Sequence, residues 1–170
     1  MSIQHPLVLA LFDNPAAAAR AAAALHAQGT ARVDLSIVAR SHDEEVRAAR
    51  ELGATPGVEI EDSAAASRLG ELGAHVLAAV ALVMPGVGPI VAGGPLAAEF
   101  GEAAGHAAGS VADHLERAGL ARIDADIVEA AVEKGSWLLG VHVRTGSAPD
   151  VRSALSAAGA TAVYEGAWAG

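Results

Sequence analysis

The pattern of apolar and polar residues in the first forty residues predicts a strand, a helix and a second strand, in that order. Residues 6–12 are a continuous apolar run, which is typical of a buried strand. A helix is expected over 16–28, because Asn14 can cap its first turn and Gly29 can end it. Apolar and polar positions then alternate over 33–37, as in a strand with one buried face. This stretch therefore predicts a βαβ unit.

The last third of the chain repeats this order. Its pattern predicts a strand over 137–143, a helix over 149–158 and a strand over 161–164, with a short helix over 125–134 before them. Two βαβ units that pack together make a four-stranded antiparallel sheet of the ferredoxin-like kind. We therefore expect an α+β, ferredoxin-like fold.

The middle of the chain has a different character and predicts a Gly-rich helical hairpin that interrupts this fold. We expect one helix over 64–83 and a second over 96–118. The turn between them is rich in residues that break helices: Pro85, Gly86, Gly88, Pro89, Gly93, Gly94 and Pro95. The chain then divides into a first half, a hairpin insertion and a second half: 1–62, 63–119 and 120–170.

A glycine stripe marks the second predicted helix. Gly101, Gly105 and Gly109 recur every four residues, and Ala97 and Ala108 add small side chains near them. Glycine costs a helix roughly 1 kcal/mol relative to alanine, so a stripe of glycines indicates close approach of another helix. The approaching helix is either the first helix of the same hairpin or a hairpin of a second copy. The second interpretation predicts a homo-oligomer.

A membrane-associated hairpin is an alternative, because residues 76–98 carry no charge. The prolines prevent one straight span. The second helix contains Glu99 and Asp113, and ionised groups in mid-membrane cost about 2.5–3.5 kcal/mol each. A re-entrant or peripheral hairpin is the form of membrane contact that these residues allow.

Composition narrows the function classes. The chain has 170 residues, a one-domain length, with 52% hydrophobic and only 3% aromatic residues. Its net charge of −9 argues against a nucleic-acid partner. The absence of cysteine excludes disulfides and thiol nucleophiles. The N-terminus has no basic segment before its apolar run, so a cytoplasmic location is expected, with membrane association as the alternative.

Two Glu–His pairs are the one candidate for chemistry. Glu71 and His75 lie four residues apart on the first predicted helix, and Glu102 and His106 do so on the second. If the hairpin folds about Ile90, the four side chains can converge as ligands of a zinc or iron ion. In the competing interpretation, each pair is an ion pair or faces solvent. No other cofactor is expected, and no nucleophile-elbow motif is present, which argues against a hydrolase.

The run over 80–98 contains Met84-Pro85-Gly86-Val87-Gly88-Pro89 and ends in Gly94-Pro95-Leu96-Ala97-Ala98. Together with 126–139, it resembles a bacterial group of general stress proteins and low-temperature-induced proteins with a glycine-zipper insert. The resemblance implies a stress-associated, non-enzymatic protein of otherwise unknown function. We therefore predict a homo-oligomeric scaffold or assembly protein, whose further protein partner the sequence does not identify. A membrane-associated protein and a metal-binding protein are the alternatives.

Overall fold

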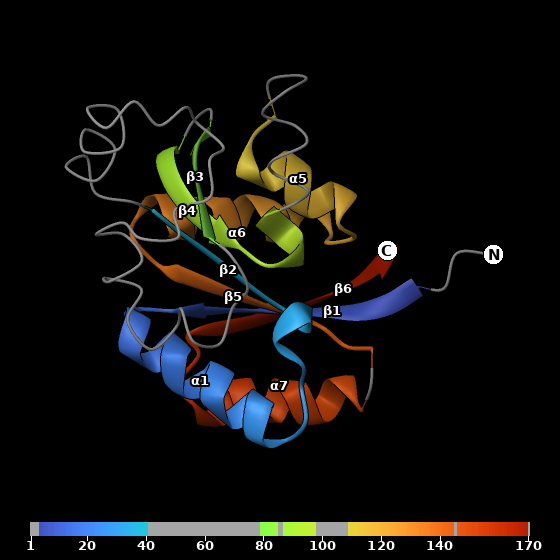
Figure 1. The fold of residues 1–170 in the computed structure, drawn as a ribbon. Coiled ribbons are helices and arrows are strands. Elements are labelled where there is room, and N and C mark those ends of the chain that lie inside the picture. Colours follow the sequence, from blue (N-terminus) through green and yellow to red (C-terminus); the bar gives the residue numbers. More distant parts are fainter. Residues whose placement is uncertain (1–3, 41–78, 85–86, 98–108, 145, 170) are drawn as a thin grey trace.

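The computed structural model describes residues 4–40, 79–84, 87–97, 109–144 and 146–169 (Figure 1). They form an α+β fold around one antiparallel sheet, whose six strands lie in the order β3-β4-β2-β5-β1-β6. The strands are β1 (Gln4–Phe12), β2 (Leu35–Arg40), β3 (Ala79–Met84), β4 (Gly88–Gly93), β5 (Trp137–His142) and β6 (Ala162–Ala169). The helices are α1 (Pro15–Ala27), α5 (Val111–Arg117), α6 (Arg122–Glu133) and α7 (Ala148–Ala157).

Both predicted βαβ units are confirmed. Asn14 caps α1 as expected, since its Oδ1 accepts a hydrogen bond of 2.9 Å from the Ala17 N–H. The strand predicted over 33–37 begins only at Leu35, because a 3₁₀ turn (Arg32–Asp34) precedes it and leaves Val33 exposed. β6 is longer than predicted and reaches Ala169.

The two units interleave within the sheet. β5 lies between β1 and β2, and β1 lies between β5 and β6, so each helix connects two strands that are not neighbours. Helices α1 and α7 both cover the same face of the sheet (Figure 1). The apolar core on this face includes Phe12, Leu25, Ile37, Leu139, Val141 and Leu155.

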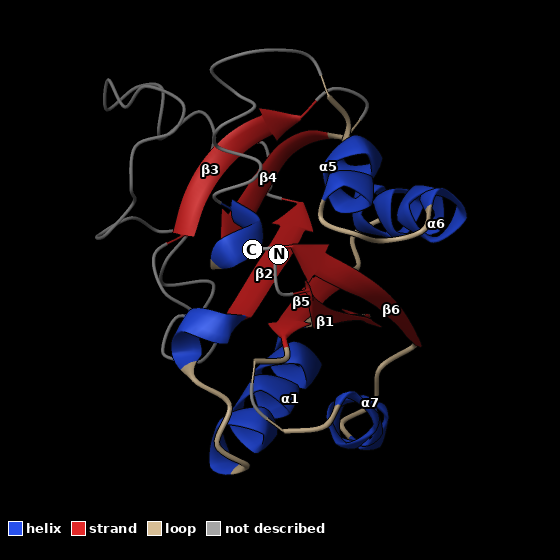
Figure 2. Ribbon diagram, turned by 90° about the vertical axis from the view of Figure 1, so that its right-hand side faces the viewer, coloured by secondary structure: helices blue, strands red, loops and turns tan. Residues whose placement is uncertain are grey.

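Helices α5 and α6 cover the opposite face (Figure 2). The core on that side joins Leu7, Leu9 and Leu11 of β1 to buried residues of the two helices, among them Leu115, Val128 and Val132. The sheet is therefore the middle of three layers in the described part of the chain.

The helical hairpin is the main incorrect prediction. The end of the first predicted helix is strand β3, and much of the predicted turn is strand β4. The two strands form a β-hairpin, and β4 also pairs with β2 from Ile37↔Gly93 to Arg40↔Ile90. A short apolar run fits a helix or a buried strand equally well by pattern. Here the strand is favoured because the edge of β2 that does not face β5 pairs with β4.

The second predicted helix, 96–118, is also not continuous. Residues 95–97 form a helical segment, whereas Gly109 and Ser110 lie outside any helix and α5 begins at Val111. Ser110 and Asp113 form a capping box: Ser110 Oγ accepts from the Asp113 N–H, and an Asp113 carboxylate oxygen accepts from the Ser110 N–H. This box starts a new helix after Gly109.

Candidate functional site

Most residues of the predicted sites lie outside the described residues. These are Glu71, His75, Glu102 and His106 of the metal hypothesis, Gly101, Gly105 and Ala108 of the glycine stripe, and Pro85 and Gly86 of the turn. Within the described segments, no group of three or more His, Asp or Glu side chains is placed to hold a metal ion.

The described members of the glycine stripe do not share a helix. Ala97 is buried against the core beneath α5 and α6. Gly109 precedes the cap of α5, and a Cβ there would meet the imidazole of His114 at 3.2 Å. For Gly109, the tight packing that the glycine indicates is with its own following helix.

The described turn residues divide between a strand and a sharp bend. Gly88, Pro89 and Gly93 belong to β4. Gly94 has φ +80°, and a Cβ there would overlap the backbone of Leu35 and Ser36. The bend at Gly94 and Pro95 therefore crosses directly over the start of β2, which only glycine permits.

A buried polar pair lies beside this crossing. Ser36 and His142 are 0% and 1% exposed, and Ser36 Oγ is 3.4 Å from His142 Nε2. The N–H of Leu96 donates to the same Ser36 Oγ at 3.0 Å. Ser36 thus connects β2 with β5 and with the segment after β4.

His142 is neutral in this setting. Burial lowers its pKa to about 4, and the positive charge of Arg144 acts in the same direction. Its buried Nδ1 has no hydrogen-bond partner among the described residues. The ring packs edge-on against Trp168 with 4.2 Å between centroids. Protonation would place an uncompensated charge there, so the native fold disfavours it.

Arg144 closes the outer side of this cluster. Its guanidinium lies 5.7 Å from the Trp168 ring centroid, and its Nε is 2.9 Å from Asp34 Oδ1. The Asp34 side chain is only 10% exposed, whereas Arg144 is 49% exposed. The cluster of Asp34, Ser36, His142, Arg144 and Trp168 therefore joins β2, β5 and β6. Its Ser–His pair is enclosed by the surrounding residues.

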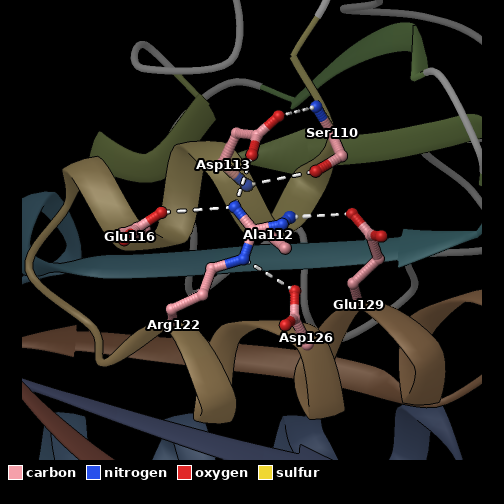
Figure 3. Close-up of polar contacts among 7 residues, drawn as sticks. All are labelled: Ser110, Ala112, Asp113, Glu116, Arg122, Asp126 and Glu129. Carbon is pink, nitrogen blue, oxygen red and sulfur yellow. Dashed lines mark hydrogen bonds and ion pairs between the residues drawn. The ribbon is translucent and has the colours of Figure 1, made fainter.

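A second polar cluster joins α5 to α6 on the surface (Figure 3). The guanidinium of Arg122 pairs with Asp113 at 2.6 Å, with Asp126 at 2.9 Å and with Glu116 at 3.2 Å. The Ser110 backbone N–H and Arg122 together lower the pKa of Asp113 to about 2, and the acidic neighbours raise the pKa of Arg122.

Glu129 completes this connection by accepting a 2.8 Å hydrogen bond from the Ala112 N–H, at the open first turn of α5 (Figure 3). Every acidic group of this cluster thus has a structural partner, and the arrangement fixes α5 on α6. This cluster was not predicted from the sequence, although the Ser110–Asp113 spacing is a signal for the start of a helix.

Comparison of the chain with family models, with curated proteins and with solved structures found no match. None of the helices in the described segments combines the length and hydropathy of a membrane span. The β3–β4 hairpin contains no residue of either polar cluster. It extends the sheet at one end, within the uncharged stretch 76–98.

Proposed function

We propose that this chain is a non-enzymatic, homo-oligomeric scaffold or assembly protein with a role in stress. Its core is of the ferredoxin-like kind, an interpretation supported by the order β2-β5-β1-β6 of the strands from the two βαβ units. The association with stress rests on the resemblance of residues 80–98 and 126–139.

The observation that carries the proposal is the uncharged hairpin at one end of the sheet. A chain with net charge −9 repels its own copies, and a contact is favoured where charge is absent. β3 and β4 contain no ionisable residue, and among the described residues β3 is the terminal strand of the sheet. A terminal apolar strand is a template for pairing with another chain.

The enclosed Ser36–His142 pair supports the non-enzymatic part of the proposal. A nucleophile and its base must reach a substrate, and both side chains are buried by neighbouring packing. The lowered pKa of His142 is explained by burial and by Arg144.

The mass of the detergent-free protein, measured by light scattering on a sizing column, tests the proposal. We expect a discrete multiple of 16.9 kDa. A monomer at all concentrations contradicts self-association. Protein that sediments with membranes and needs detergent to dissolve supports the re-entrant alternative instead. The Gly105→Leu variant tests in the same assay whether the predicted glycine stripe contributes to self-association. If the stripe is a contact, the leucine side chain should disrupt it and lower the measured mass.

A further inference from the structure

We infer that two copies of this chain join their sheets through antiparallel pairing of β3 with β3 of the second copy, about a two-fold axis at Ala81. This inference rests on the proposed function, because it names the surface through which the scaffold assembles. In this inference, the primary contact between the copies is the edge of β3 and not the predicted glycine stripe.

The direction of the β3 backbone follows from hydrogen bonds elsewhere in the sheet. The Val143 N–H donates to the Pro6 carbonyl, so even-numbered residues of β1 face β5. Along each strand, successive residues direct their backbone N–H and C=O groups toward opposite neighbouring strands. The registers of β5, β2 and β4 therefore fix which residues of β3 face β4. Its even-numbered residues face β4, and Ala79, Ala81 and Val83 point their N–H and C=O groups away from the sheet.

Two further observations agree with this assignment. The Ala167 N–H donates to Gly119, outside the sheet, as the same alternation requires for β6. Pro89 has no N–H, and the alternation turns its nitrogen toward β2 just where the β2–β4 pairing ends at Ile90. β3 therefore presents alternate residues to an incoming strand.

The opposite edge of the sheet is protected against such pairing. β6 already uses the Ala167 N–H, and Glu165 is one of its outward-facing residues. Glu165 is also ion-paired with Arg152 of α7 at 2.9 Å. The charge of Glu165 on this edge disfavours pairing with another strand.

A second copy is the partner that the β3 edge fits. Ala79–Met84 contains no charge, no proline and no glycine, so a two-fold pairing opposes no like charges. The pairing puts Ala81 opposite Ala81, and Ala79 opposite Val83 of the second copy. Each outward-facing pair then exchanges both backbone hydrogen bonds. The stretch 76–98 around β3 contains no charged residue, so no acidic residue is close in sequence to the paired strands.

The chain allows a direct test, because it contains no cysteine. An Ala81→Cys variant should form a disulfide-linked dimer with copper–phenanthroline, since paired Cα atoms lie about 5.5 Å apart, within disulfide reach. The matched control is Ala167→Cys, an exposed outward position on β6. We expect at least tenfold more cross-linked dimer from Ala81→Cys.

A second variant removes the pairing without adding a reactive group. Ala81→Pro deletes an outward N–H and should lower the mass measured by light scattering, while circular dichroism stays unchanged. An oligomer in which Ala81→Cys fails to cross-link, or in which Ala81→Pro folds and keeps its mass, overturns the inference and leaves the proposed function standing. A monomeric natural chain overturns both.

Discussion

The two faces of the sheet are built in different ways. The face under α1 and α7 is closed by the two βαβ units themselves, and the helices bury only apolar side chains there. The other face is closed by segments from the middle of the chain, and it contains the buried Ser36, His114 and His142. Apolar packing suffices where a helix follows its own strand. Where distant segments must meet, polar contacts and close backbone crossings fix their positions.

Gly94→Ala should have the largest effect on this difference. The variant combines a positive φ with a Cβ that overlaps the Leu35 backbone at the crossing. We expect a loss of about 4 kcal/mol in the free energy of unfolding, measured in urea at fixed protein concentration. The control is Gly29→Ala, which has φ +99° but open space around its Cβ, and should lose only about 1 kcal/mol. Equal losses would show that the crossing is not tightly constrained.

The next largest effect is a pH dependence due to His142. Its pKa of about 4 in the fold lies below the ordinary 6.5, so unfolded chains bind a proton first as the pH falls. The contribution of His142 to the free energy of unfolding is complete above pH 6.5 and decreases as the pH falls toward 4. We expect a loss of about 2 kcal/mol between pH 7 and pH 5 from urea unfolding.

His142→Phe should flatten this slope, whatever its own cost at pH 7. The Asp113 carboxylate, with its pKa lowered to about 2, loses its contribution only below pH 3.8, so the two groups act in separate pH ranges. An unchanged slope in His142→Phe would show that other groups cause the acid sensitivity.

The face under α1 and α7 was predictable because its signals are local. Asn14 and Gly29 bound the helix as the sequence indicates, and β1 beside it contains a continuous apolar run. In each case, the residues that determine an element lie within or next to it.

The other face depends on contacts that no short window contains. Whether 79–84 is helix or strand is decided by the β4 and β2 edges, which pair across about fifty residues of chain. The meeting of His142 with Trp168 needs the registers of three strands. By contrast, the start of α5 could have been predicted, because Ser110 and Asp113 have the spacing of a capping box.

A smaller effect tests how closely α1 lies on the sheet. Ala18 is 0% exposed and packs in an alanine-rich contact, so Ala18→Leu should force α1 away from the sheet. We expect a loss of about 2 kcal/mol in urea unfolding. Ala16→Leu, at an exposed position of the same helix, is the matched control and should change stability by less than about 0.5 kcal/mol. A tolerated Ala18→Leu would mean that this face is loosely packed.

The smallest effect separates the two parts of the α5 cap. Ser110→Ala removes the hydroxyl that accepts from the Asp113 N–H and should cost about 1 kcal/mol, as should Asn14→Ala at the start of α1. It leaves the Ser110 backbone N–H, the largest cause of the lowered pKa of Asp113. NMR titration should therefore still give a pKa well below 3.8 in Ser110→Ala.

Arg122→Gln provides the complementary variant, because it removes the second cause and keeps the cap. The pKa of Asp113 should rise toward 3.8 but stay below it, since the Ser110 N–H still donates to the carboxylate. A complete return to 3.8 would assign the shift to Arg122 alone. The cap of α5 would then depend on its contact with α6, and this helix start would be as non-local as the strands beside it.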